Sequence, residues 1–368
     1  MHTGKPGGPL YGLFRGQLRR LLEIWRLNNM SNENHIPFIK LEHGSGGALS
    51  RDLIDQLIFP IFKNKYFSQL SDATSFYLTE EALITTDSYV IDPPFFPGGD
   101  IGRLAVFGTC NDLAVSGGKP HYITLALILE EGFALASLEK ILRSALKAAE
   151  EAGISVLTGD TKVVPRGKGG NIFINTTGVG RRVFPFPLTP QSIRSRDVVI
   201  VTGPLGSHGI TVLAAREELK VAKHLKTDCA LLYPLCSELF TFGSELRFLR
   251  DATRGGAAAI LNEICQNQSF GIEVREEAFP VEDEVALAAD ILGLNPLEIA
   301  NEGVAVAVVS PSVAAEVCRK LKNQPLGKRA AIVGEITGNN EGRVILKTTA
   351  GGRRILDYPR GLLLPRIC

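Results

Sequence analysis

Five aspartates of this sequence stand beside glycines or near the ends of expected strands and helices, instead of on solvated helix faces: Asp72, Asp87, Asp112, Asp160 and Asp251. Taken alone, each is more often a turn or helix-cap residue. Taken together, they suit Mg²⁺, which prefers a few carboxylates and completes its shell with phosphate oxygens. The set therefore indicates metal ions that hold a polyphosphate.

Two glycine clusters could contact such a polyphosphate through their backbone N–H groups. The first runs His-Gly-Ser-Gly-Gly over residues 43–47 and lacks the spacing of a P-loop; a flexible loop explains it equally well. The second covers residues 203–209 between an expected strand and helix, where N–H groups can face an anion. An ordinary tight turn is as good an explanation there.

The cysteines give a third chemical signal. Six cysteines are spread along 368 residues without a C-x-x-C pair. This spacing does not indicate a disulfide framework and favours a protein of the reducing cytosol. Cys368 is the last residue. It is not a prenylation box, in which the cysteine stands fourth from the end.

The elements that must position these residues form two groups. The first group alternates strands with helices and predicts a domain over residues 36–185 with a mixed sheet. We expect strands over 82–86, 122–129, 154–157 and 172–179, a helix over 101–116, and a helix capped by Ser137 that ends at Gly153. In this scheme Asp87 and Asp160 directly follow strands.

A proline-rich break over residues 184–190 precedes a second domain, which we place at 190–347. Its expected strands cover 198–201, 303–309 and 331–333, and its expected helices start near 210 and cover 228–240, 256–266 and 296–300. From residue 348 to 368 we expect a flexible tail that carries Cys368, with Gly351 and Gly352 as its hinge.

Composition excludes several classes of protein. The formal charge is +1 and 45% of the residues are apolar, so the chain is neither a basic nucleic-acid binder nor disordered throughout. It has no apolar run long enough to span a bilayer, and we expect a cytoplasmic protein. Residues 1–35 form an extension, in which 13–26 read as a basic amphipathic helix or as sequence translated upstream of Met30.

From residue 41 onward these motifs, in this order, resemble the superfamily of aminoimidazole ribonucleotide synthetase, thiamine-monophosphate kinase, selenophosphate synthetase and the hydrogenase maturation factor HypE. The matching segments are the glycine cluster, Thr-Thr-Asp at 85–87, Asn-Asp-Leu at 111–113 and Asp-Ala-Thr-Arg-Gly-Gly at 251–256. The resemblance implies a two-domain α/β (α+β) fold, in which helices flank mixed sheets. It also implies that ATP binds at a homodimer interface.

The same resemblance assigns residues to the nucleotide and its metal. Mg²⁺ and ATP would be held by Asp72, Asp87, Asp112 and Asp251. The residues expected to bind the nucleotide are Gly44, Ser45, Gly46, Gly47, Asn111, Asp160, Thr161 and Arg254.

Within the superfamily, three segments resemble HypE: Pro-Arg-Ile-Cys at 365–368, Thr-Gly-Asp-Thr-Lys at 158–162 and Asn-Glu-Gly at 301–303. This implies that the carbamoyltransferase HypF loads a carbamoyl group onto the Cys368 thiolate, which Arg366 favours. ATP-dependent dehydration then gives a thiocyanate, and cyanide passes to iron on a HypC–HypD complex for NiFe hydrogenase.

Two further residues receive catalytic roles in this reaction. Lys162 would neutralise the phosphates, and Glu302 would take a proton from the amide. Each can also be read as a surface or ion-pair residue.

Other interpretations explain less of the sequence. A selenophosphate synthetase would have a reactive cysteine near the glycine cluster, whereas the first cysteine here is Cys110. A purine-type synthetase or a thiamine-phosphate kinase leaves Cys368 without a role. A carrier that presents Cys368 without using ATP leaves the aspartates without one.

Overall fold

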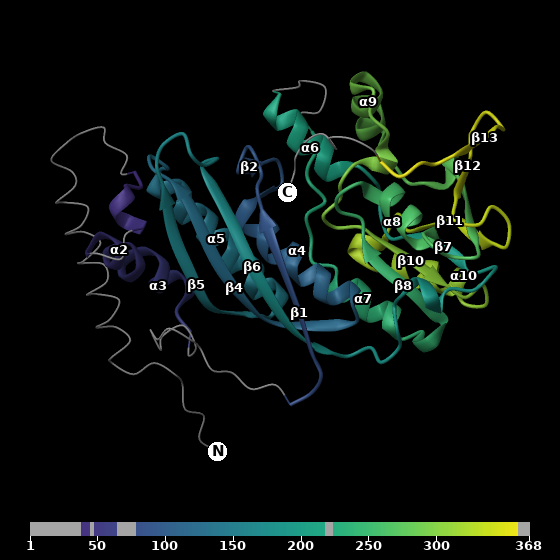
Figure 1. Cartoon of the computed structure of the whole chain (residues 1–368), viewed down its shortest axis with the longest axis horizontal. Coiled ribbons are helices and arrows are strands. Elements are labelled where there is room, and N and C mark those ends of the chain that lie inside the picture. Colours follow the sequence, from purple (N-terminus) through teal and green to yellow (C-terminus); the bar gives the residue numbers. More distant parts are fainter. Residues whose placement is uncertain (1–37, 45–47, 65–78, 218–223, 360–368) are drawn as a thin grey trace, which may run out of the picture.

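The computed structural model describes residues 38–44, 48–64, 79–217 and 224–359. Strands form a four-stranded sheet in the order β1-β6-β4-β5 and a seven-stranded sheet in the order β13-β12-β9-β11-β7-β10-β8 (Figure 1). Each contains one parallel pair, β4 with β5 and β12 with β9, among antiparallel ones. The predicted α/β fold with mixed sheets is therefore confirmed.

Among the described residues, helices cover one face of the four-stranded sheet and leave the other uncovered. Its strands are β1 (Ala82–Tyr89), β4 (Gly118–Glu130), β5 (Ser155–Val164) and β6 (Ile172–Arg182). Helices α4 (Ile101–Val115) and α5 (Leu135–Ala152) pack under it, and every second residue of β4 from Ile123 to Leu129 is buried against them. The alternate residues remain accessible, with Ile84 73% and Ile128 40% exposed. We call this uncovered side the open face.

Smaller elements flank this sheet. They are a 3₁₀ helix (Leu41–Gly44), α2 (Ala48–Leu53), a π-helix (Ile54–Ile58), α3 (Phe59–Phe62), β2 (Phe95–Phe96) and β3 (Gly99–Asp100). The helices of this group pack at the β5 edge of the sheet.

The seven-stranded sheet consists of β7 (Val198–Val201), β8 (Leu246–Asp251), β9 (Gly271–Arg275), β10 (Ala305–Val309), β11 (Ala331–Thr337), β12 (Val344–Lys347) and β13 (Arg353–Ile355). Its helices are α6 (Ser207–Arg216), α7 (Tyr233–Phe240), α8 (Gly256–Cys265), α9 (Asp283–Leu292) and α10 (Ala314–Lys322). Short 3₁₀ turns cover Pro190–Ser192, Gly243–Glu245, Glu276–Ala278, Pro296–Glu298 and Pro325–Gly327. Among the described residues, no helix is both long and apolar enough to cross a membrane.

Several predicted boundaries were wrong. β1 continues through Asp87 and β5 through Asp160, so neither aspartate follows its strand. The helix capped in our prediction by Ser137 starts at Leu135 after Ala134, and the helix expected over 228–240 starts at Tyr233. The segment 296–300 contains only a 3₁₀ turn, and the strand expected from 303 begins at Ala305.

The predicted tail also begins later than expected. β13 pairs with β12, and the next residue, Leu356, is 1% exposed and donates its N–H to the Val344 carbonyl oxygen at 2.9 Å. The Tyr358 hydroxyl donates to Glu263 on α8 at 3.1 Å. Residues 353–358 therefore belong to the folded part of the chain. The domain boundaries at 35, 185, 190 and 347 stay predictions. The whole of the extension 1–35 lies outside the described residues.

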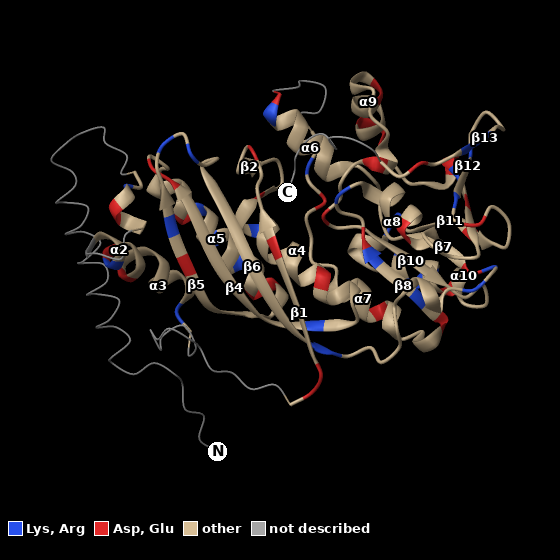
Figure 2. Ribbon diagram, viewed as in Figure 1, with Lys and Arg blue, Asp and Glu red and all other residues tan. Residues whose placement is uncertain are grey.

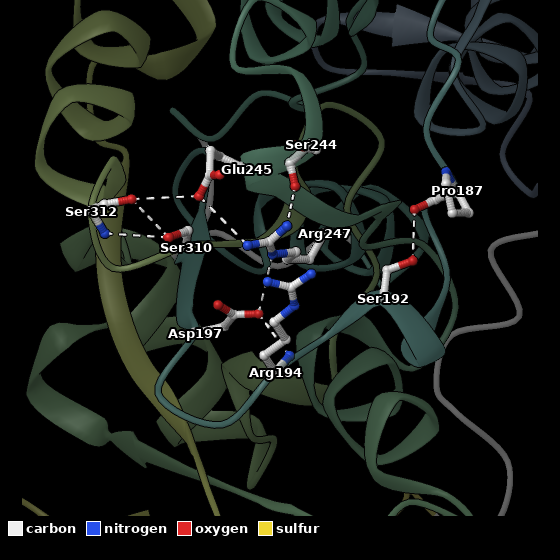
Figure 3. Close-up of polar contacts among 9 residues, drawn as sticks. All are labelled: Pro187, Ser192, Arg194, Asp197, Ser244, Glu245, Arg247, Ser310 and Ser312. Atoms are coloured by element: carbon white, nitrogen blue, oxygen red, sulfur yellow. Dashed lines mark hydrogen bonds and ion pairs between the residues drawn. The ribbon is translucent and has the colours of Figure 1, made fainter.

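A polar network ties the segment before β7 to the start of β8 (Figure 3). Asp197 is 2% exposed, and its carboxylate accepts the Arg194 N–H at 2.7 Å and lies 3.6 Å from Arg247 Nε. The Arg247 guanidinium also donates to the Ser244 carbonyl oxygen and lies 3.5 Å from Glu245. Because Asp197 and Arg247 are both buried, losing one leaves the other charge without its partner.

We therefore expect Arg247→Ala to lower the free energy of unfolding by about 3 kcal/mol, the scale for breaking a buried ion pair. Arg319→Ala is the matched control, because the Arg319–Glu316 pair on α10 is exposed and such pairs contribute little. Urea unfolding of both variants measures the difference. Equal losses in the two variants would contradict this account of the network.

Candidate functional site

Three aspartates converge where α4 passes between β1 and β8. Asp112 lies on α4, and its carboxylate accepts the Thr85 hydroxyl of β1 at 3.0 Å. Asp87 is two residues further along β1 and therefore faces the same side of the sheet. Asp251 ends β8, a strand that α4 also contacts. The first group of candidate residues, which we call the acidic cluster, comprises Asp87, Asp112 and Asp251.

Burial and mutual repulsion disfavour the ionised form of the carboxylates in the acidic cluster. Burial, and next the charge of Asp112, raise the pKa of Asp251. Burial also raises the pKa of Asp112, while the Thr85 hydrogen bond opposes that rise. Among the described residues, no lysine or arginine forms an ion pair with Asp112 or Asp251. A cation placed between these carboxylates would relieve their repulsion.

The donor set fits Mg²⁺ better than a metal held wholly by protein. Within the described residues, no three acidic, histidine or cysteine side chains are grouped closely enough to enclose an ion. Mg²⁺ needs no such cage, since it commonly takes one or two carboxylates and completes its shell with phosphate oxygens and water. The acidic cluster could hold it in this way.

The turn after β8 brings a fourth candidate, Arg254, to the same end of the sheet. Gly255 and Gly256 both have positive φ, at 76° and 57°, and lead directly into α8. A Cβ at Gly256 would lie 2.6 Å from the carbonyl oxygens of Leu297 and Ile299, so only glycine fits. Arg254 is exposed, and its charge opposes the rise in the pKa of Asp112.

Asn111, the neighbour of Asp112, joins α4 to the second half of the chain. Its side-chain NH₂ donates to the carbonyl oxygens of Ala230 at 3.0 Å and Glu302 at 3.2 Å. Its side-chain oxygen accepts the Leu232 N–H at 2.8 Å. Asn111 is 1% exposed and uses its side chain for these contacts, so the structure gives it a role in joining the two sheets. Glu302 lies at this junction and is 4% exposed.

A second group of candidates lies at the opposite edge of the sheet, on β5. Asp160 and Lys162 form an ion pair at 3.6 Å, with side chains 64% and 65% exposed. Beside them, a cavity of about 350 Å³ is lined by Gly44, Thr161 and apolar side chains of β4 and the π-helix. A Cβ at Gly44 would lie 2.4 Å from the Val163 backbone nitrogen, so the first glycine of the cluster packs directly on β5. We call Gly44, Asp160, Thr161 and Lys162 the β5 group.

The two groups are separated within one chain. Lys162 pairs in register with Ile128, and Asp160 with Ala126, which places both side chains on the open face. Asp87 pairs with Thr176 and faces α4 on the other side. β1 and β5 stand three strand spacings apart, about 14 Å. Figure 2 shows β5, which carries acidic and basic residues, and β1, which carries an acidic one, at opposite edges of the sheet.

The structure therefore brings Asp87, Asn111, Asp112, Asp251, Arg254 and Glu302 to one region and the β5 group to another. Ser45, Gly46, Gly47, Asp72 and Cys368 lie outside the described residues. Asp228 was missed by the sequence analysis, although its carboxylate accepts the backbone N–H groups of Glu302 and Gly303. No local pattern marks it, because an aspartate after Thr227 resembles any turn residue.

Comparison with known proteins gives matches over most of the chain. Residues 71–182 match the family of AIR synthase related proteins in its N-terminal domain, and residues 195–347 match the C-terminal domain. The carbamoyl dehydratase HypE of Bradyrhizobium diazoefficiens is 42% identical over 332 residues, covering 90% of this chain and 96% of that protein. HypE of Escherichia coli K12 is 42% identical over 336 residues, covering 90% and 99%.

Solved structures give the same result. The chain is similar to a HypE crystal structure in complex with ATP, with a TM-score of 0.85 and 40% identity over 89% of this chain and 99% of that one. A HypE–HypF complex gives a TM-score of 0.73 and 40% identity over 85% and 100%. Thiamine monophosphate kinase of Aquifex aeolicus, at 17% identity and a TM-score of 0.57, shares the fold alone. The resemblance read from the motifs is confirmed: this chain belongs to the HypE carbamoyl dehydratase family of AIR synthase related proteins.

Proposed function

We propose that this enzyme uses ATP to dehydrate a carbamoyl group on Cys368, which turns a thiocarboxamide into a thiocyanate that supplies cyanide to the iron of NiFe hydrogenase. The names of its relatives support the reaction. The structural observation that carries the proposal is the acidic cluster, whose partly buried carboxylates raise one another's pKa and form no ion pair among the described residues. A Mg²⁺–nucleotide complex would supply a cation.

ATP is assigned to this chain because a relative with 40% identity binds it. Asp87, Asp112 and Asp251 are the described residues that would hold Mg²⁺, joined by Asp72 in our sequence prediction. Bound Mg²⁺ would neutralise charge on the transferring phosphate. Arg254 lies at the same end of β8 and would contribute a further positive charge.

The chain's own residues perform the remaining steps. The carbamoyl oxygen of S–C(=O)–NH₂ attacks the γ-phosphorus of ATP, which releases ADP and makes that oxygen a leaving group. Glu302 then takes a proton from the nitrogen, the C–O bond breaks, and phosphate leaves. Loss of the second nitrogen proton gives S–C≡N. Lys162 stabilises the phosphate during its transfer.

A homodimer would resolve the separation of the two groups. Lys162 and the acidic cluster of the same chain lie at opposite edges of the sheet, on β5 and next to β1, so we assign Lys162 to a phosphate held by the other subunit. The open face is the natural contact for a second copy, since its exposed side chains include Ile84 and Ile128. Each acidic cluster would then use the β5 group of the partner subunit.

The tail must reach both this site and the proposed partner HypF, which a HypE relative binds. Because Tyr358 is held by Glu263, Cys368 lies ten residues beyond this anchor. An extended chain of that length spans at most about 36 Å. The loading site on HypF and the acceptor HypC–HypD complex must therefore bring their reactive groups within that radius of Tyr358.

The first prediction concerns the thiol. Cys368→Ala should fold normally and accept no carbamoyl group from HypF, since the remaining described cysteines are buried or partly buried and burial raises their pKa values. Peptide mass spectrometry after incubation with HypF and carbamoyl phosphate checks this. An adduct of normal yield on the variant, at whatever residue, would sink the proposal.

The second prediction concerns the metal. Asp251→Asn should weaken Mg²⁺–ATP binding at least about tenfold, because a neutral amide replaces a hard anionic ligand. Carbamoylation of Cys368 should be unchanged, because HypF performs it. Asp290→Asn, at an exposed position of α9, is the control and should bind normally. Titration calorimetry measures both variants, and equal affinities would refute the assignment of the metal site.

The third prediction concerns the dimer. Lys162→Ala and Asp251→Asn should each be inactive alone, and an equal mixture of the two, refolded together, should regain about one quarter of wild-type activity. Half of the dimers are then mixed, and each mixed dimer has one intact site. Mixing either variant with itself is the control. If the mixture stays inactive while subunit exchange is demonstrated, both residues act within one chain.

A further inference from the structure

Asp228 lies in the segment between α6 and α7 and contacts the loop that carries Glu302. Both of its carboxylate oxygens accept the Glu302 N–H at 3.2 Å, and one also accepts the Gly303 N–H at 3.2 Å. The His208 N–H of α6 is a further donor to it. One side chain thus binds the backbone on both sides of the Glu302 carbonyl group.

The Asp228 carboxylate is held by backbone N–H groups. Among the described residues, no lysine, arginine or histidine side chain forms an ion pair with Asp228. The nearby His208 imidazole is fully buried, which lowers its pKa to about 3, so the ring is neutral at neutral pH. Burial raises the pKa of Asp228 to about 6 against the effect of its backbone donors. Burying a charge here is costly, and the backbone N–H groups of Glu302, Gly303 and His208 offset that cost.

The loop that Asp228 binds is held from every side. The Asn301 N–H donates to the Ala252 carbonyl oxygen at 2.9 Å, and the Ala252 N–H donates to the Val304 carbonyl oxygen at 2.8 Å. The Glu302 carbonyl oxygen accepts from Asn111 on α4. A Cβ at Gly303 would lie 2.0 Å from the Asp228 carbonyl oxygen, so the two segments are in direct contact. Only the Glu302 and Gly303 N–H groups depend on Asp228.

We propose that Asp228 is a positioning residue for the catalytic base Glu302: it fixes the backbone of residues 302 and 303 so that the Glu302 carboxylate meets the amide proton of the substrate. This inference rests on the proposed function, in which Glu302 is the base. It adds a residue to the reaction that does not touch the substrate and acts through the backbone that Glu302 belongs to.

Position 228 requires a side chain that accepts hydrogen bonds and donates none, because it faces the N–H groups of Glu302 and Gly303. A carboxylate offers only acceptor sites, whereas the NH₂ group of asparagine would face the N–H groups of Glu302 or Gly303 and repel one of them. The resulting shift of the loop moves the Glu302 carboxylate. Misplacement of a base by a fraction of an ångström lowers the rate of proton transfer without changing how ATP binds.

The test compares four proteins by single-turnover mass analysis of the carbamoylated enzyme at saturating ATP and Mg²⁺: wild type, Asp228→Asn, Glu302→Gln and the double variant. Asp228→Asn should convert thiocarboxamide to thiocyanate about 10-fold more slowly than wild type, with an ATP dissociation constant within about twofold. Asp197→Asn is the matched control, since Asp197 also accepts a backbone N–H but lies in the network beside β7. It should convert at the wild-type rate.

The double variant separates positioning from a structural role. If Asp228 acts through Glu302, Asp228→Asn adds no further loss to Glu302→Gln, because the base that it positions is already gone. A multiplied loss, or a wild-type rate in Asp228→Asn while Glu302→Gln is slow, overturns this inference and leaves the proposed function intact. A wild-type rate in Glu302→Gln removes the assignment of Glu302 as the base, and this inference with it. If Asp228→Asn does not fold by circular dichroism, Asp228→Ser replaces it with the same expectations.

Discussion

The carboxylates of Asp112 and Asp251 lie on two elements that pack against each other, α4 and β8. Each raises the cost of ionising the other, and neither forms an ion pair with a lysine or arginine among the described residues. Bringing such charges together opposes folding unless something else holds the elements in place. Asn111 supplies part of this restraint, since it precedes Asp112 and makes three hydrogen bonds across to the segments at Ala230, Leu232 and Glu302. The apolar contacts of α4 with α7 and β8 supply the rest. The fold thus presents an anionic site that the proposed metal–nucleotide complex would complete.

The contact between the end of β8 and the loop of Glu302 also links the proposed metal site to the proposed base. Ala252 follows Asp251 and exchanges backbone hydrogen bonds with Asn301 and Val304, so the end of β8 and the loop of Glu302 form one unit. The tail that carries the thiol is anchored on α8, the helix that follows the same β8 turn. The proposed metal ligand Asp251, the proposed base Glu302 and the root of the tail therefore belong to neighbouring segments. Lys162 does not, which is why the proposed site needs a second copy of the chain.

Local signals in the sequence predicted much of this fold. The apolar spacing before Gly117 and Gly118 predicted α4. Of the four aspartates named from the family motifs, Asp87, Asp112 and Asp251 lie close together beside it, and Asp72 is outside the described residues. The end of β5 was mispredicted because Gly159 and Asp160 are typical of a loop, whereas here they lie on an edge strand beside the open face. Which strands are neighbours depends on long-range packing, so no local pattern revealed that Lys162 and Asp87 face opposite sides. The anchored root of the tail was missed for a similar reason: β13 has three residues, and its pairing with β12 is tertiary.

The most direct test of the account is the intact mass of the carbamoylated wild-type protein under three conditions: with ATP and Mg²⁺, with ATP and a chelator, and with Mg²⁺ alone. We predict that the adduct loses the mass of one water molecule only when ATP and Mg²⁺ are both present, since the carbonyl oxygen leaves only as phosphate. An adduct that keeps its mass in all three conditions, or that loses water without ATP, would contradict the proposal that this site couples a metal-bound nucleotide to dehydration of the terminal thiocarboxamide.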